Sequence, residues 1–310
     1  NEFRQDLEHW EKQRGQAIDF PEKSKSYLLF NWADQLVHHP KILDAVEDVI
    51  GPDILVYHST LFLKEANTPA YVRWHQDSPY FYLSPHLHVT AWVALSDASI
   101  AAGCMQVLPG SHQWGVFEHD DKPEPMNMMR RGQGISDRFA HTTGTFIPVG
   151  PGQMSLHHTD LVHASGGNTT NDRRLGFAIS YIPAHVKPIG TIKPSALCVR
   201  GRSHGNFLEE TRLKQPLHEE AYKAQTPGHS FTQSDLEQWV GELMVRPVFT
   251  AHPTEAARRS ILNKLGEVAK LLDQDLNPRQ NERLAETVEL LWQTDELRLN
   301  RPEPLDEAMN

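Results

Sequence analysis

The sequence is poor in cysteine, lacks long apolar runs and has no excess of positive charge. Its two cysteines, Cys104 and Cys198, lie far apart and outside any Cys-x-x-Cys pattern, which argues against a disulfide framework and predicts a cytoplasmic location. No stretch approaches the roughly 20 apolar residues that a membrane helix needs. The formal net charge of −10 and the lack of a basic stripe argue against a nucleic-acid partner. We therefore expect a globular protein with no membrane or nucleic-acid partner, and predict no particular oligomeric state.

The 18 histidines are distributed unevenly along the chain. Only His252 lies after residue 230. The segment from Gln225 to Ser230 contains a Pro-Gly pair, which is typical of a linker. We therefore predict a domain over residues 1–228 and a second segment over residues 229–310. Because the chain begins at Asn1 without a methionine, we expect it to be part of a longer protein.

The first domain has a helical pattern followed by a β pattern. Residues 1–50 predict helices, since Ile42, Val46 and Ile50 recur at helical spacing and Gly51 ends the run. Short runs rich in Val, Ile, Phe, Tyr and Thr then alternate with turn clusters, without the βαβ alternation of a parallel sheet. The predicted strands are 54–64, 71–75, 88–96, 105–108, 144–149, 153–157, 175–182 and 196–200. This pattern predicts a mainly β sandwich or jelly roll with N-terminal helices.

The second segment has the pattern of two amphipathic helices. Residues 254–272 and 282–297 each place leucine, isoleucine or valine on one face, and Asn277-Pro278 separates them. This predicts a C-terminal α-helical hairpin. Such a pair needs a partner surface, because it cannot bury its apolar stripe alone.

A His-x-Asp pair, His75 and Asp77, is the first candidate for a metal site. On a strand, residues i and i+2 point to the same face, so an imidazole and a carboxylate would emerge side by side. Alone, this pair is more often a satisfied surface pair. A second imidazole from the stretch 156–168 would complete two histidines and one carboxylate, the ligand set typical of non-haem Fe(II) oxygenases. We favour His163 for this role, and His157 and His158 are the alternatives.

An arginine pair follows the favoured histidine. Arg174 lies at the start of a predicted strand, where its guanidinium could bind a dicarboxylate cosubstrate bidentately. The alternatives are that Arg173 has this role or that the pair is a solvated turn. Residues 113–143 form a long insertion that we interpret as a lid. For the remaining histidines we expect surface or core positions: His86, His88, His112, His119 and His141.

The ordered motifs resemble those of the phytanoyl-CoA dioxygenase family over about residues 20–215. They are Trp-His-Gln-Asp-Ser-Pro-Tyr at 74–80, Val-Thr-Ala-Trp-Val-Ala-Leu at 89–95, Gly-Cys-Met-Gln-Val-Leu-Pro-Gly-Ser-His at 103–112, and His163 with Arg174. The resemblance implies a double-stranded β-helix, a cupin-like jelly roll.

The resemblance also implies a chemistry. It makes His75, Asp77 and His163 the iron ligands and Arg174 the partner of the distal carboxylate of 2-oxoglutarate, with two further residues facing that cosubstrate, Ser165 and Trp92. The implied reaction uses Fe(II), 2-oxoglutarate and O2, releases succinate and CO2, and hydroxylates a small organic substrate.

The tail carries a second resemblance, to the N-terminal part of phosphoenolpyruvate carboxylase, over about residues 235–310. The motifs are Val-Phe-Thr-Ala-His-Pro-Thr-Glu-Ala-Ala-Arg-Arg at 248–259 and Leu-Trp-Gln-Thr-Asp-Glu-Leu-Arg at 291–298. The resemblance makes His252 the counterpart of a catalytic histidine. The later phosphate-binding and metal-binding motifs of that family are not in this sequence, so we expect His252 to be inactive here.

Three functions remain in competition at this point. The first is an iron and 2-oxoglutarate dependent hydroxylase. The second is a carboxylase fragment, forming oxaloacetate, with the jelly roll as an appended module. The third is a cupin-like binding module without catalysis. The presence of His75, Asp77, His163 and Arg174 together favours the hydroxylase.

Overall fold

The computed structural model describes residues 2–19, 22–121, 124–129, 133–135, 139, 141–189 and 193–212. The chain divides into two compact units, residues 1–227 and 228–310, and the described residues lie in the first. The predicted helical hairpin and His252 lie outside them. Within the described part, no helix has both the length and the apolar character needed to cross a membrane.

Helices occupy the N-terminal part, as predicted. They are α1 (Glu2–Arg14), the 3-10 turn η1 (Ser26–Leu28), α2 (Asn31–Val37) and α3 (Pro40–Ile50). The last of these begins with Pro40 in its first turn and ends at Gly51, whose φ of 89° suits glycine. Its apolar stripe is buried through Ile42, Leu43 and Val46, which confirms the spacing argument.

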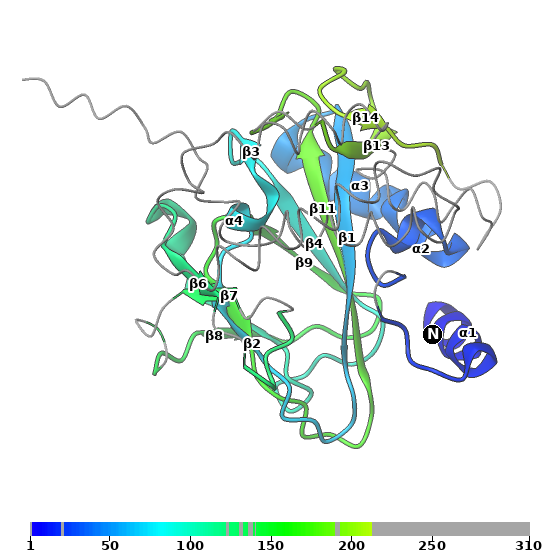
Figure 1. Ribbon diagram of the computed structural model, residues 1–310, viewed down its shortest axis with the longest axis vertical. Coiled ribbons are helices and arrows are strands. Elements are labelled where there is room, and N and C mark those ends of the chain that lie inside the picture. Colours follow the sequence, from blue (N-terminus) through cyan, green and yellow to red (C-terminus); the bar gives the residue numbers. More distant parts are fainter. Residues whose placement is uncertain are drawn as a thin grey trace, which may run out of the picture. The chain divides into compact units, whose positions relative to one another are not determined.

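The larger sheet has six strands in the order β14-β13-β1-β11-β4-β9. Its members are β1 (Ile54–Lys64), β4 (Val89–Ala94), β9 (Met154–His158), β11 (Arg174–Pro183), β13 (Ser195–Arg200) and β14 (Leu208–Glu209). Neighbours pair antiparallel, except that β13 and β14 are parallel. In Figure 1, β1 and β11 cross the centre of the sheet, with α2 and α3 beside them.

The second sheet has four strands in the order β2-β10-β5-β8. They are β2 (Val72–His75), β5 (Met105–Val107), β8 (Thr145–Ile147) and β10 (His163–Ser165). Shorter elements complete the described part: α4 (Ser78–Phe81), η2 (Ser111–Gln113), and the pairs β3 (Leu83–Ser84) with β12 (Lys187–Pro188) and β6 (His119–Asp121) with β7 (Gln133–Ile135). The mainly β prediction is confirmed. The predicted lid contains β6 and β7, and its role stays a prediction.

The central strand β11 separates two environments. Leu175, Phe177, Ile179 and Tyr181 belong to one buried apolar cluster with the N-terminal helices, where the Trp32 and Phe177 rings meet edge to face at 5.6 Å. Because strand side chains alternate, Arg174, with Gly176 and Ala178, faces the opposite side. The strand pattern thus buries a charged residue away from the helix layer.

Candidate metal centre

His75 and His163 are brought together by strand pairing. His75 ends β2, His163 begins β10, and the two residues lie directly opposite each other in this antiparallel pair. Their ring centroids are 4.0 Å apart. Two residues separated by 88 positions in the chain therefore share one site because of the register of two short strands.

Asp77 reaches this site by a different route from the one predicted. The sequence argument placed His75 and Asp77 on one strand, but β2 ends at His75 and Asp77 precedes α4 with helical torsion angles, φ −77° and ψ −33°. The backbone N–H of Asp77 donates to the Thr159 carbonyl oxygen at 2.8 Å, which fixes the turn. His75 and Asp77 do lie close together, as predicted. The turn before α4 brings them together, not the alternation of side chains along one strand.

The three side chains converge on one point. Asp77 Oδ1 lies 3.5 Å from His75 Nε2 and 3.8 Å from His163 Nε2, and one ligand atom from each of the three residues lies within 4.8 Å of the others. The Nδ1 atoms of His75 and His163 contact the main-chain oxygens of Arg73 and Leu161 at 2.8 and 2.9 Å. A carbonyl only accepts, so each Nδ1 carries the proton and each Nε2 presents a lone pair.

The protonation states also suit a dication. Burial raises the pKa of Asp77, but the surrounding imidazoles of His163, His157 and His75 outweigh burial and hold that pKa well below its usual value. Burial, reinforced by His75, lowers the pKa of His163 well below its usual value. The result is a carboxylate beside a neutral imidazole, the forms in which both bind metals. Thr90 Oγ1 donates to Asp77 Oδ2 at 3.0 Å, which leaves Oδ1 for the site.

Of the two alternative histidines, His157 lies beside this group and His158 lies outside it. His157 is buried, its Nε2 is 3.6 Å from Asp77 Oδ2, and its ring nitrogens have no hydrogen-bond partner among the described residues. His158 Nδ1 accepts from the backbone of Asp160 at 3.1 Å. The group of three that the described residues offer contains neither of them.

Two buried cations form a second group. Arg174 begins β11 and pairs with Lys64 at the end of β1, and the two residues are 3% and 0% exposed. The Arg174 guanidinium lies 5.2 Å from the Trp92 ring centroid, and its Nε has no hydrogen-bond partner in the described part of the chain. Lys64 Nζ donates to Ser165 Oγ at 2.7 Å and to the Gly166 carbonyl oxygen. Sequence reasoning missed Lys64, although a lysine closing the apolar run Leu-Phe-Leu was a visible signal.

The charges of Arg174 and Lys64 favour the binding of an anion. Burial, and then the charge of Arg174, lowers the pKa of Lys64 to about 7, and burial lowers the pKa of Arg174 to about 10. Like charges directly opposite each other on a sheet are destabilising. A bound carboxylate would offset both charges and accept a hydrogen bond from the Nε–H of Arg174, which is unpaired in the described part of the chain.

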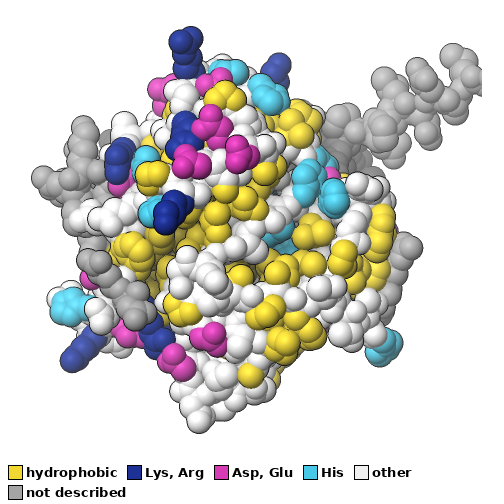
Figure 2. Space-filling view, turned by 180° about the vertical axis from the view of Figure 1, so that it is seen from behind, with side chains coloured by type: hydrophobic (Ala, Val, Ile, Leu, Met, Phe, Trp, Pro, Cys, Tyr) yellow, Lys and Arg dark blue, Asp and Glu magenta, His cyan; other side chains and the backbone are white. Residues whose placement is uncertain are grey.

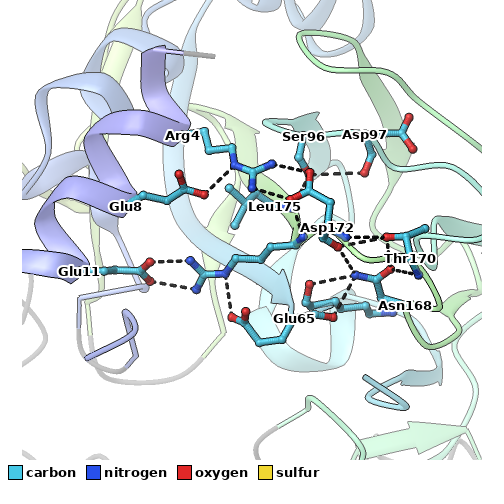
Figure 3. Close-up of polar contacts among 12 residues, drawn as sticks. Arg4, Glu8, Glu11, Glu65, Ser96, Asp97, Asn168, Thr170, Asp172 and Leu175 are labelled. Atoms are coloured by element: carbon cyan, nitrogen blue, oxygen red, sulfur yellow. Dashed lines mark hydrogen bonds and ion pairs between the residues drawn. The ribbon is translucent and has the colours of Figure 1, made fainter. Parts of the chain in front are cut away.

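Arg173 has a different environment from its neighbour. Its guanidinium bonds Glu11 at 2.9 Å and Glu65 at 2.7 Å. In the same region Arg4 donates two hydrogen bonds of 2.7 Å to Asp172. Figure 3 shows that these contacts connect helix α1 to the loop before β11. The contacts favour Arg174, not Arg173, as the residue available to a ligand.

Gly176 provides a test of the Trp92 and Arg174 arrangement. A Cβ at this position would lie 1.9 Å from Trp92 Cζ2, so Gly176→Ala must displace the indole. We expect this change to lower the free energy of unfolding by about 1–3 kcal/mol, measured by urea denaturation. Gly166→Ala is the control, since a Cβ there meets nothing within 4 Å. Equal stability of the Gly176 variant and this control would contradict the packing described.

Four of the histidines expected in surface or core positions are exposed or make ordinary contacts. His119 Nε2 accepts from the backbone N–H of Gln76 at 2.9 Å, His86 contacts Asp160 at 3.1 Å, and His141 is exposed. The ring of His112 lies near that of His158, with centroids 5.8 Å apart and planes tilted by 50°. Figure 2 shows hydrophobic side chains gathered around a hollow on one face of the molecule, with histidines among them.

Comparisons with protein families agree with both resemblances. The family model described as phytanoyl-CoA dioxygenase matches residues 12–176, and the model described as phosphoenolpyruvate carboxylase matches residues 202–310. The second match begins upstream of the predicted residue 235. Its first residues pack in the first unit, where Phe207 is 2% exposed in a cluster with Leu55 and Ile182.

Individual relatives are similar over part of their length. The chain is 29% identical over 185 residues to a probable alpha-ketoglutarate-dependent hypophosphite dioxygenase of Stutzerimonas stutzeri, covering 58% of this chain and 63% of that protein. It is 30% identical over 175 residues to the peroxisomal phytanoyl-CoA dioxygenase of Homo sapiens, covering 55% and 49%. Over 120 residues it is 36% identical to the phosphoenolpyruvate carboxylase of Acinetobacter baylyi, covering 36% of this chain but 13% of that enzyme. The chain thus spans about half to two thirds of the dioxygenase relatives.

Two solved structures of a non-heme monooxygenase are also similar to this chain. The apo form of ThoJ, a non-heme monooxygenase, has 34% sequence identity and a TM-score of 0.63, covering 77% of this chain and 88% of that one. A ThoJ complex with nickel has 32% identity and a TM-score of 0.58, covering 76% and 87%.

Proposed function

The chain belongs to the phytanoyl-CoA dioxygenase family, and from that premise we propose that residues 1–228 form an Fe(II)- and 2-oxoglutarate-dependent dioxygenase unit with a jelly-roll fold. This unit would hydroxylate a small organic substrate and release succinate and CO2. One observation carries the proposal: His75, Asp77 and His163 present free ligand atoms to one another beside two buried cations.

The donor set fits a divalent iron ion. His75 Nε2, Asp77 Oδ1 and His163 Nε2 would hold the ion, and the carboxylate would offset part of its charge. When bound, the iron supplies the oxidation of an unactivated C–H bond by O2, coupled to decarboxylation of the cosubstrate. The similar protein ThoJ forms a complex with nickel, which supports metal binding by this fold.

The cation pair would orient the cosubstrate. Arg174 and Lys64 would donate to the distal carboxylate of 2-oxoglutarate, while Ser165 Oγ and the Trp92 ring hold the two cations in place. The name of the Stutzerimonas stutzeri relative, an alpha-ketoglutarate-dependent enzyme, supports this cosubstrate.

Asp77 favours hydroxylation over halogenation. In related iron enzymes that install chlorine, halide occupies the position of the missing carboxylate. Here Asp77 Oδ1 fills that position beside both histidines. We therefore propose an alcohol as product, even in chloride buffer.

A succinate-release assay tests the proposed function. The protein, Fe(II), 2-oxoglutarate and O2 would be incubated with a panel of small organic molecules, and succinate and the oxidised product would be measured by mass spectrometry. We expect at least one compound to stimulate succinate release and to gain one oxygen atom. Chlorinated product, or turnover that persists after metal removal by a chelator, would contradict the proposal.

The carboxylase-like tail is expected to contribute no carboxylation. The chain covers 13% of the Acinetobacter baylyi enzyme, and the phosphate-binding and metal-binding motifs expected later in that family are not in this sequence. We predict that this chain forms no oxaloacetate from phosphoenolpyruvate and bicarbonate, measured with a coupled malate dehydrogenase assay.

Removing the tail tests its independence. We predict that a chain without residues 229–310 binds metal and 2-oxoglutarate as the full chain does, measured by calorimetry. Loss of both affinities in the shortened chain would show that the second segment completes the first.

A further inference from the structure

One short segment connects the candidate metal centre to the two buried cations. It runs from His163 at the start of β10 to Arg174 at the start of β11, and its residues after His163 accept hydrogen bonds from Lys64. Asn168 lies near the middle of this segment and is 1% exposed. A buried amide must find partners for two N–H donors and one oxygen, so the contacts of Asn168 show what it holds together.

The side-chain amide of Asn168 joins the ends of two strands. Its Nδ2 donates to the main-chain oxygens of Lys64 at 3.3 Å and Glu65 at 3.0 Å, where β1 ends. It also donates to the main-chain oxygen of Asp172 at 2.8 Å, two residues before β11 begins. Figure 3 shows the Asn168 side chain among Glu65, Thr170 and Asp172. One amide therefore holds the backbone on both sides of the cation pair.

The orientation of this amide follows from its partners. The backbone N–H of Thr170 can only donate, and its nitrogen lies 3.0 Å from Asn168 Oδ1. The three main-chain oxygens can only accept, so they face Nδ2. An aspartate at this position would instead turn a carboxylate oxygen toward three carbonyl oxygens. The contacts therefore require an amide, and not merely a polar side chain of this shape.

The turn before Asn168 packs closely against neighbouring backbone. A Cβ on Gly167 would lie 2.8 Å from the Thr68 carbonyl oxygen, and a Cβ on Gly103 would lie 2.5 Å from the Gly166 carbonyl oxygen. The Gly166 carbonyl is also the oxygen that accepts from Lys64 Nζ. A shift of this turn would therefore move a hydrogen-bond partner of the lysine.

We propose that Asn168 is a positioning residue for the cosubstrate: its amide sets the spacing of Lys64 and Arg174, and so the affinity for the distal carboxylate of 2-oxoglutarate. The two cations lie directly opposite each other on β1 and β11, where like charges push the strand ends apart. The three bonds from Asn168 oppose that separation before a carboxylate binds. The proposal rests on the proposed dioxygenase function, because it concerns the cosubstrate of that site.

Isothermal titration of the Mn(II)-loaded full chain tests this role without turnover. The ratio of the affinities for 2-oxoglutarate and 2-oxobutanoate measures what the distal carboxylate contributes. Asn168→Ala removes the amide, and we expect this ratio to fall by about tenfold, the loss that corresponds to one hydrogen bond to a charged group. Asn168→Ser keeps one donor and should show a smaller fall. Mn(II) affinity should change much less in both variants, because neither touches a metal ligand.

Two controls separate positioning from a general loss of stability. Asn206→Ala removes a part-buried amide that donates to the Ala184 carbonyl oxygen at 3.0 Å, beyond the other end of β11. Asn171→Ala removes an exposed amide of the same loop, whose oxygen accepts from Asn67 at 3.0 Å. Both controls should keep the full affinity ratio, even if the Asn206 change lowers the free energy of unfolding.

The outcomes distinguish this proposal from the function on which it rests. A folded Asn168→Ala protein with the full affinity ratio, or an equal fall in the Asn206 control, would overturn the positioning role. If the alanine variant does not fold, the serine variant decides, and the full ratio in that variant would overturn the role. Failure of the dioxygenase function would appear instead in the unmodified protein, as no preference for 2-oxoglutarate over 2-oxobutanoate, and would remove both.

Discussion

Replacing Asp77 by alanine is expected to abolish turnover and to weaken metal binding by more than about 100-fold. Loss of an outer-shell partner of a metal ligand already costs about 10–100-fold in affinity, and Asp77 is a proposed ligand itself. The change also leaves His75 Nε2 and His163 Nε2 without the oxygen that lies 3.5 and 3.8 Å away. The measurements are succinate release and calorimetric titration with Mn(II), which binds the same donor types.

The control removes a nearby carboxylate outside the group. Asp160→Ala deletes the partner of His86, whose Nδ1 lies 3.1 Å from Asp160, and should leave Mn(II) affinity nearly unchanged. Asp77→Glu should retain the charge but place it one methylene away, so metal binding should recover more than turnover. Equal Mn(II) affinity in the Asp77→Ala variant and the unmodified protein would remove Asp77 from the ligand set.

Replacing Lys64 by methionine and Arg174 by alanine is expected to weaken 2-oxoglutarate binding by about tenfold or more in each case. A hydrogen bond to a charged group contributes about 1.5–3 kcal/mol, Arg174 has an unpaired Nε donor in the described part of the chain, and Lys64 lies opposite it. Metal affinity should change much less. Isothermal titration of the Mn(II)-loaded protein with 2-oxoglutarate measures the loss.

Two comparisons make this prediction specific. Binding of 2-oxobutanoate, which lacks the distal carboxylate, should be insensitive to both substitutions. Arg173→Ala should also have little effect, because Arg173 bonds Glu11 and Glu65 instead. A larger loss in the Arg173 variant than in the Arg174 variant would mean that the neighbouring arginine binds the cosubstrate.

The low pKa of Lys64 adds a pH dependence. Lys64 titrates at about pH 7 in the free protein, because burial and then Arg174 disfavour its charge. A bound carboxylate raises that pKa, so binding takes up a proton above pH 7. The affinity for 2-oxoglutarate should therefore be greatest below pH 7 and fall as the pH rises above it. In Lys64→Met this fall should be absent.

Local patterns in the sequence predicted the fold better than they predicted how the site is built. The strand 54–64 and the helix ending at Gly51 followed from residue spacing and turn chemistry, which act over a few positions. The pairing of His75 with His163 depends on a register across the sheet, and local periodicity contains no information about it. The motif resemblance supplied that proximity instead.

Lys64 and His88 show why the rest of the site's surroundings could not be predicted. Lys64 stands at the end of a strand, where a lysine is ordinarily solvated, and only its pairing with Arg174 on β11 buries it. His88 has an ordinary sequence context, and its burial next to Thr90, whose hydroxyl donates to Asp77, follows only from the fold. Both features depend on contacts between distant segments.

A crystal structure of the protein grown without oxygen, with Mn(II) and 2-oxoglutarate, tests the central claim most directly. The account predicts a metal ion bonded to His75 Nε2, Asp77 Oδ1 and His163 Nε2, with the distal carboxylate of 2-oxoglutarate between Lys64 and Arg174. A metal ion held by His157 or His158 in place of Asp77, or a carboxylate bound away from the two cations, would contradict it.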